Sequence, residues 1–188
     1  MRIAVIQGSA RNGGNTEDLT RLVLEGIPYT NIVLREKEIK PIRDQRHEEG
    51  GFDPVDDDYD ELIQLVLEHD VLIFATPVYW YGASGLMKNF IDRWSQSLRD
   101  VRFNFKDQMA SKTAYAVVVG GDNPRIKALP LIQQLQYTFD FVGLSFAGYV
   151  IGKGSKPGEV LKDARAVRDA ATLNAELRKA EPLAVNRS

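Results

Sequence analysis

The sequence predicts one α/β domain in which a mostly parallel sheet is covered by helices on both faces. Short apolar runs, rich in β-branched or aromatic residues, alternate along the chain with segments of helical periodicity. The runs are apolar almost throughout, as expected of parallel strands that are buried on both faces. The chain has 188 residues, the size of one ordinary domain, so we expect residues 1–188 to form a single unit.

Five apolar runs define the expected strands. Strands that alternate with helices imply right-handed β-α-β crossovers, which place successive strands parallel in one sheet. The predicted strands are residues 3–6, 31–34, 71–75, 115–119 and 146–151.

Helices are expected in the segments between these strands, where apolar residues recur at three- and four-residue spacing. Leu86, Phe90 and Trp94, for example, lie on one helical face. The predicted helical segments are 19–27, 62–66, 86–98, 126–141 and 158–180.

Two segments fall outside this alternation. Residues 40–57 are polar and rich in Gly and Asp, so we interpret them as an insertion before the second helix, serving as a lid or an interface. Residues 181–188 follow the last helical pattern and contain Pro182, a helix breaker, so we expect a frayed tail.

Composition excludes several classes of function. The 24 Lys and Arg residues are interleaved with 26 Asp and Glu residues, whereas a nucleic-acid-binding protein usually has a basic face. No cysteine is present, which excludes disulfides, thiolate metal ligands and a cysteine nucleophile. No signal-type segment and no apolar run near 18 residues is found, so we expect a cytoplasmic protein that does not bind membranes.

The first strand leads into a loop that suits an anion. Residues 8–16 read Gly-Ser-Ala-Arg-Asn-Gly-Gly-Asn-Thr, with Asn15 or Thr16 expected as the N-cap of the next helix. Backbone N–H groups, the helix dipole and polar side chains would bind a phosphate here, with Arg11 as a bidentate partner. The side-chain candidates are Ser9, Arg11, Asn15 and Thr16.

Two familiar nucleotide loops do not fit residues 8–16. A Walker loop requires Lys and then Ser or Thr after Gly13, and the dinucleotide fingerprint requires glycines at positions 10 and 13. The remaining alternative is that the loop only closes a tight turn between strand and helix.

The loop after the third strand is aromatic. Residues 76–82 read Thr-Pro-Val-Tyr-Trp-Tyr-Gly, and a flat ring system such as an isoalloxazine needs planar stacking partners of this kind. The alternative is a role in the core or in a dimer interface. Three consecutive aromatic residues cannot all face one core, so at least one is expected to be exposed. The candidate ligand-binding residues are Pro77, Val78, Tyr79, Trp80 and Tyr81.

After the fourth strand, Gly120 and Gly121 would allow a ligand to approach the backbone closely, and Asp122 could accept a hydrogen bond from it. A Gly-Gly-Asp turn alone is weak evidence. In open α/β sheets, however, ligands bind at the carboxyl ends of the strands, where this loop should meet the other two.

These motifs together resemble the NADPH-dependent FMN reductase and flavodoxin-like NAD(P)H oxidoreductase family. The resemblance is carried by Gly-Ser-x-Arg and Gly-Asn-Thr after the first strand, and by residues 76–82 with Gly-Leu-Met-Lys-Asn-Phe-Ile-Asp-Arg-Trp at 85–94. It implies a flavodoxin-like three-layer sandwich with a five-stranded parallel sheet in the order 2-1-3-4-5.

The same resemblance implies a function. FMN would bind noncovalently, with its phosphate at residues 9–16 and its ring between residues 77–81 and 120–122, and NADPH or NADH would be the co-substrate. Hydride would pass through the flavin N5 to a quinone, a flavin or a similar small acceptor, with no catalytic side chain and no metal. A homodimer or homotetramer would complete the site. Several relatives carry cysteines after the second strand, where this chain has residues 41–44 without any.

Two other functions are weighed against this enzyme. An electron-carrying flavodoxin would be more acidic and would lack Arg11, and a receiver-type protein would need an acidic residue where Thr76 and Pro77 stand. Among the remaining polar residues, Lys88 and Asp92 are expected to form a simple helical ion pair, and Arg93 to behave similarly. His47 is expected to be exposed, and His69 to contact a helix C-terminus.

Overall fold

The computed structural model describes residues 1–180, and the frayed tail expected at 181–188 lies outside the described residues. Five parallel strands form one sheet in the order β2-β1-β3-β4-β5, which confirms the predicted fold class and strand order. The strands are β1 (Ile3–Gln7), β2 (Thr30–Val33), β3 (Val71–Pro77), β4 (Thr113–Gly120) and β5 (Ser145–Lys153).

Central strands are apolar because both of their faces are covered. All five residues of β1 are buried, as are the first six of β3, whereas β5 lies at the edge and exposes alternate residues in its first half. The sheet is in register throughout except between β4 and β5, where Ala114 pairs with Phe146 but Tyr115 pairs with Gly148. The intervening Ala147 therefore forms a β-bulge at the edge.

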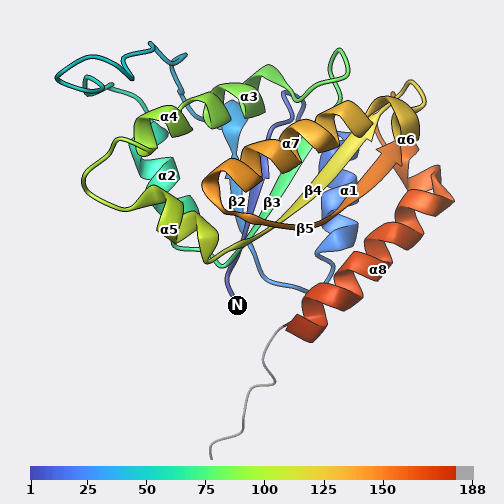
Figure 1. The fold of residues 1–188 in the computed structure, drawn as a ribbon. Coiled ribbons are helices and arrows are strands. Elements are labelled where there is room, and N and C mark those ends of the chain that lie inside the picture. Colours follow the sequence, from blue (N-terminus) through green and yellow to red (C-terminus); the bar gives the residue numbers. More distant parts are fainter. Residues whose placement is uncertain (181–188) are drawn as a thin grey trace, which may run out of the picture.

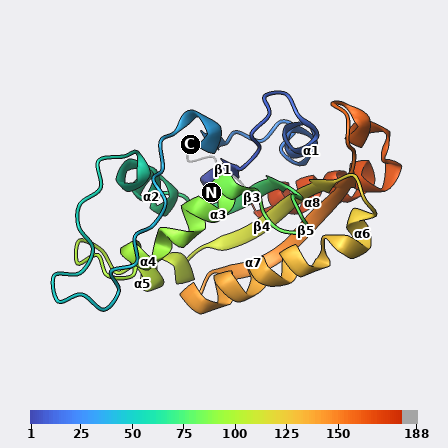
Figure 2. The same cartoon turned by 90° about the horizontal axis from the view of Figure 1, so that it is seen from above.

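Helices cover the two faces unequally (Figures 1 and 2). One face packs against α1 and α8, which contact each other, and the other face packs against α2, α3, α4, α5 and α7. The helices are α1 (Asn15–Val23), α2 (Tyr59–Leu67), α3 (Gly85–Asp92), α4 (Trp94–Ser97), α5 (Phe105–Ala110), α6 (Pro124–Lys127), α7 (Leu129–Val142) and α8 (Ala164–Ala180), with 3-10 turns η1 (Leu34–Glu36) and η2 (Glu159–Lys162).

Several predicted element bounds were wrong. The helix expected at 86–98 is divided into α3 and α4 at Arg93, and the one expected at 126–141 is divided at Ala128, which precedes a proline in the first turn of α7. Helix α5 was not predicted, because six residues are too few to establish helical periodicity. Leu34 begins a 3-10 turn instead of ending β2.

Residues 40–57, the predicted insertion, contain no helix or strand and precede α2. Both views show it extending from the opposite side of the molecule from α6 (Figures 1 and 2). Within residues 1–180, no helix combines the length and the apolar character needed to cross a membrane.

Candidate functional site

Loops at the carboxyl edge of the sheet surround a cavity of about 170 Å³. Backbone hydrogen bonds extend the sheet into these loops, from Val78 N to Val119 O at 2.8 Å and from Gly154 N to Gly120 O at 3.0 Å. The cavity lining brings together most of the predicted site residues, namely Ser9, Arg11, Asn15, Thr16, Pro77, Val78, Tyr79, Gly120 and Gly121. It also includes four residues that were not predicted: Gly14, Val119, Gly154 and Ser155.

The loop after β1 presents the start of α1 to this cavity. Gly14 is the N-cap of α1, with extended backbone angles, so the expectation of an N-cap at Asn15 or Thr16 was wrong by one residue. Within the described chain, the backbone N–H groups of Asn15 and Thr16 have no hydrogen-bond partner, as is usual for the first turn of a helix. These donors and the positive end of the helix dipole suit an anion.

Ser9 and Arg11 shape the same loop. The Ser9 hydroxyl is buried and accepts a hydrogen bond from Arg11 N at 3.2 Å. The exposed Arg11 guanidinium makes a long contact of 3.5 Å with Ser155 O, so most of its donors are available to a ligand.

Arg35, in the 3-10 turn η1 that follows β2, holds this loop, and it was not among the predicted site residues. Its guanidinium pairs with Glu17 at 2.5 Å and donates to the side chain of Asn12 at 3.2 Å. Glu17 in turn accepts a hydrogen bond from Gly13 N at 2.9 Å. The order β2-β1 places the end of β2 beside this loop, so a charged residue directly after the second strand was the available signal.

The Asn15 side chain, a predicted phosphate ligand, makes two hydrogen bonds within the protein. Its amide donates to Lys156 O at 2.8 Å and accepts from Val160 N at 3.2 Å. The side chain therefore holds the loop after β5 beside the cavity. This contact explains how Gly154 and Ser155, which the sequence argument also missed, come to line it.

The aromatic loop after β3 is a tight hairpin. Tyr79 and Gly82 exchange two backbone hydrogen bonds of 3.0 Å, and the two residues between them both have positive φ angles, 50° at Trp80 and 65° at Tyr81. Positive φ costs a non-glycine residue on the order of 1–2 kcal/mol. The hairpin leaves Trp80 96% exposed, which confirms that the aromatic residues do not all enter the core.

Buried hydroxyls fix this hairpin to the loop after β1. The Ser84 hydroxyl donates to Gly8 O at 2.5 Å and accepts from Met87 N, capping α3. Ser84 N in turn donates to the Thr76 hydroxyl at 3.0 Å. The loops after β1 and β3 are therefore held together by side chains that do not line the cavity themselves.

A second cavity, of about 200 Å³, adjoins the first and shares Val78, Gly120 and Gly121 with it. Across it, Asp122 accepts hydrogen bonds from the Tyr81 hydroxyl at 3.1 Å and from Lys127 Nζ at 2.5 Å. These bonds, that from Lys127 above all, lower the pKa of Asp122. The two cavities together form one groove, and Asp122 joins its two walls.

The walls of the groove approach each other closely at its glycines. A Cβ atom at Gly121 would collide with the Ser155 hydroxyl, and one at Gly120 would lie 3.2 Å from both Val78 and Pro124. A larger residue at Gly121 would require the Ser155 side chain to move, and one at Gly120 would require Val78 and Pro124 to shift by a few tenths of an ångström.

A comparison with known families identifies the chain. The pattern of the family described as NADPH-dependent FMN reductase matches residues 1–145, more than half of the sequence. The chain belongs to this family. The predictions of an FMN cofactor, of NAD(P)H as co-substrate and of oxidoreductase activity are thereby confirmed.

Two individual proteins resemble the chain over most of its length. The chain is 54% identical over 174 residues, covering 92% of this chain and 96% of the relative, to YwqN of Bacillus subtilis strain 168, provisionally named an NAD(P)H-dependent FMN-containing oxidoreductase. A solved structure described as the Trp repressor binding protein from Bacillus subtilis has a TM-score of 0.78 and 47% identity, covering 92% of this chain and 97% of that one.

A more distant FMN reductase relative differs in its metal content. Iron-sulfur flavoprotein MJ1083 of Methanocaldococcus jannaschii is 37% identical over 126 residues, which cover 64% of this chain and 62% of that protein. This chain has no cysteine to ligate such a cluster. Within residues 1–180, no group of three or more His, Asp and Glu side chains is placed to hold a metal ion.

Proposed function

We propose that FMN occupies the groove with its phosphate at the start of α1 and its ring against the aromatic hairpin. The donor set supports this placement of the phosphate: backbone N–H groups at a helix start, the Ser9 and Thr16 hydroxyls and the Arg11 guanidinium all line one cavity. Charge-assisted hydrogen bonds of this kind are among the strongest in proteins.

The second half of the groove suits a flat, partly polar ring. Pro77, Val78 and Tyr79 supply apolar contacts. Gly120 and Gly121 have no side chains, so the ring could approach their backbone closely. The Asp122 carboxylate accepts hydrogen bonds from Tyr81 and Lys127. It would therefore affect the ring indirectly, by fixing the position of the Tyr81 side chain.

When bound, FMN would accept a hydride from NADPH or NADH and pass the electrons to a small acceptor. The chain's part is to bind and orient the reactants. The N–H groups of Val78 and Tyr79 are engaged within the protein. Those of Trp80, Tyr81 and the 120–122 loop would stabilise the negative charge that the reduced ring carries. The single observation that carries this proposal is the convergence of these two loops with the loop after β1 on one groove.

For the acceptor we propose a quinone, a flavin or a similar planar molecule. Tyr79 and Tyr81 are both 47% exposed, and Trp80 almost fully, so aromatic surface remains free beside the groove. Planar aromatic molecules stack on such surface. An exposed tryptophan also suits an interface between subunits. We therefore propose a homodimer or homotetramer in which this hairpin contacts a second subunit. We also propose that the protein is cytoplasmic.

Steady-state kinetics test this function. With NADPH and a water-soluble benzoquinone both varied, double-reciprocal plots should give parallel lines, because reductant and acceptor use the same groove in turn. Intersecting lines would show that both bind at once and contradict a shared groove. Flavin that is retained but supports no turnover with any quinone or free flavin would indicate an electron carrier instead.

A further inference from the structure

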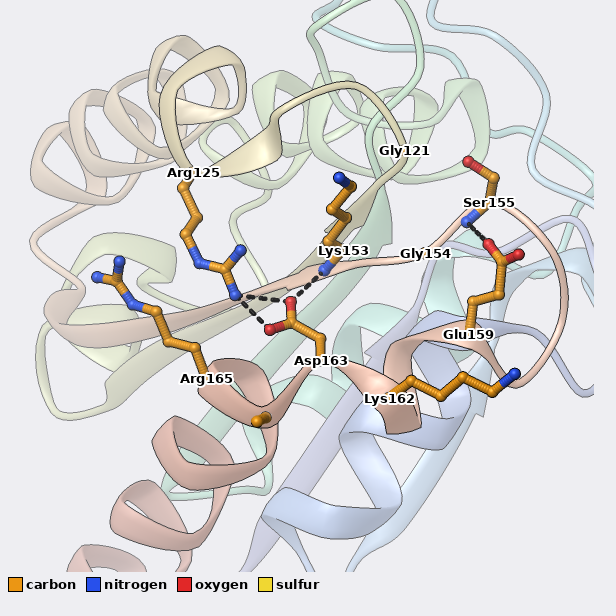
Figure 3. Close-up of a pocket in the computed structure, with 10 residues that line it drawn as sticks. Gly121, Arg125, Lys153, Gly154, Ser155, Glu159, Lys162, Asp163 and Arg165 are labelled. Carbon is orange, nitrogen blue, oxygen red and sulfur yellow. Dashed lines mark hydrogen bonds and ion pairs between the residues drawn. The ribbon is translucent and has the colours of Figure 1, made fainter.

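A larger cavity, of about 690 Å³, adjoins the proposed FMN groove on the side of β5 and α8 (Figure 3). It shares Gly121, Gly154 and Ser155 with the groove, so one extended ligand could reach both. Its polar side chains come from α6, the end of β5, η2 and the start of α8. They are Arg125, Lys153, Ser155, Glu159, Lys162, Asp163 and Arg165.

Both carboxylates in this lining are already engaged. Asp163 accepts from Arg125 Nη2 at 2.5 and 2.6 Å and from Lys153 N at 2.8 Å, as the dashed lines in Figure 3 show. Burial opposes the charge of Asp163, but these hydrogen bonds prevail and lower its pKa. Glu159 accepts from the backbone N–H groups of Ser155 and Lys156, both at 2.9 Å, which lowers its pKa as well.

The cations in the lining are less well compensated. Within residues 1–180, Lys153 and Lys162 form no ion pair, and Arg165 has only a 3.7 Å contact with Asp169. Arg125 pairs with Asp163 but its buried Nε has no hydrogen-bond partner in the described chain. Four cations against two engaged carboxylates make the cavity locally positive, although the whole chain has a net charge of −2.

We propose that this cavity, lined by Arg125, Lys153, Lys162 and Arg165, binds the phosphate-bearing adenosine end of NADPH. The inference rests on the proposed function, because it requires the nicotinamide to lie at the flavin groove. NADPH differs from NADH by a 2′-phosphate, a dianion that the two lysines, which form no ion pair within residues 1–180, and the weakly paired Arg165 would stabilise. The cavity has the size of a small-molecule site and lies beside the groove, so its position and its charge both favour the phosphorylated dinucleotide over NADH.

Calorimetric titration of the FMN-loaded protein with adenosine 2′,5′-bisphosphate and with AMP tests the cavity without turnover. The bisphosphate should bind at least tenfold more tightly than AMP. The double variant Lys153→Gln/Lys162→Gln should lose most of that difference. Arg168→Gln, which removes an exposed cation of α8 outside the cavity lining, is the matched control and should retain it.

Equal affinity for the two nucleotides, or equal losses in the double variant and the control, would overturn the proposal. Tight binding of inorganic pyrophosphate in place of the bisphosphate would also overturn it, since the cavity would then recognise phosphate without the adenosine.

Rapid-mixing reduction of the bound flavin tests the cavity assignment separately from the proposed function on which it rests. The double variant should need at least tenfold more NADPH for half-maximal reduction, but less than threefold more NADH. Flavin reduction with no preference for NADPH in the native protein overturns only the cavity assignment. Flavin that neither nucleotide reduces overturns the proposed function and, with it, the assignment to NADPH.

Discussion

Arg11 is the one charged side chain in the loop at residues 8–16, and its guanidinium makes a long contact of 3.5 Å with Ser155 O. Arg35, by contrast, is committed to Glu17 and Asn12. The two arginines therefore have different roles: Arg35 fixes the shape of the loop, and Arg11 remains able to bind a ligand.

Arg11→Ala should weaken FMN binding by tenfold or more, because a charge-assisted hydrogen bond contributes about 1.5–3 kcal/mol. Fluorescence titration of the flavin-free protein with FMN measures this loss. Arg21→Ala, which removes an exposed arginine of α1 paired with Asp18, is the control and should leave the dissociation constant unchanged. Equal affinity in the Arg11 variant and the native protein would remove Arg11 from the phosphate site.

Trp80 combines a strained backbone with nearly full exposure, and neither favours the folded monomer. Strain of this kind persists where the surrounding structure fixes it, often at a ligand site. Glycine adopts positive φ without the steric cost.

Trp80→Gly should therefore raise the free energy of unfolding by up to about 1 kcal/mol, while Trp80→Ala retains the strain and should not. Both variants should lower the rate of quinone reduction or change the oligomeric state, since both lose the ring. Urea unfolding, turnover assays and light scattering measure the three effects. A native rate and native assembly in both variants would show that the tryptophan ring has neither role.

At the scale of elements, the junction of α3 and α4 contains a buried ion pair. Arg93 Nη1 lies 2.5 Å from Asp57 Oδ2, with both side chains at most 2% exposed, and the guanidinium lies 4.5 Å from the ring centroid of Tyr59. From the sequence, Arg93 was expected to resemble the exposed pair Lys88–Asp92. That pair is confirmed, but the expectation for Arg93 was wrong, because its partner lies 36 residues earlier in the chain.

Arg93→Met should destabilise the fold by about 3 kcal/mol or more, because it leaves the Asp57 carboxylate buried without its counter-charge. Lys88→Met in the same helix removes one partner of an exposed pair and should cost less than about 1 kcal/mol. Urea unfolding at a fixed excess of FMN compares the two. Similar losses of unfolding free energy in the two variants would contradict the claim that the buried pair contributes more to stability than the exposed pair.

The same pair gives a dependence on pH. Burial opposes the charge of Asp57, but hydrogen bonds from Arg93, Lys40 N and Tyr59 N prevail and hold its pKa below the ordinary 3.8. The ionised form thus stabilises the fold above pH 3.8, and this stabilisation is lost as the pH falls below that value. Asp57→Asn should therefore lose less stability than the native protein between pH 5 and pH 2, measured by thermal unfolding. A steeper loss in the variant would contradict the lowered pKa.

Local pattern predicted most of the elements but not their interruptions. Continuous apolar runs located all five strands because both faces of the central strands are buried. The break at Arg93 depends on its ion pair with Asp57, 36 residues earlier in the chain, which no local window contains.

For the whole molecule, the topology made the candidate site predictable. A parallel sheet brings the carboxyl ends of its strands to one edge, so three separate motifs could be expected to meet, and their residues line two adjoining cavities. Arg35, Ser84 and Ser155 were missed because their roles depend on hydrogen bonds between distant segments. Short motifs report a residue's type and spacing but not such partners.

The most direct test of this account is the absorbance spectrum of the purified protein before and after anaerobic addition of NADPH. We predict a bound-flavin spectrum that bleaches within seconds. A protein that takes up no flavin, even when FMN is supplied, would contradict the central claim that these loops form an FMN site.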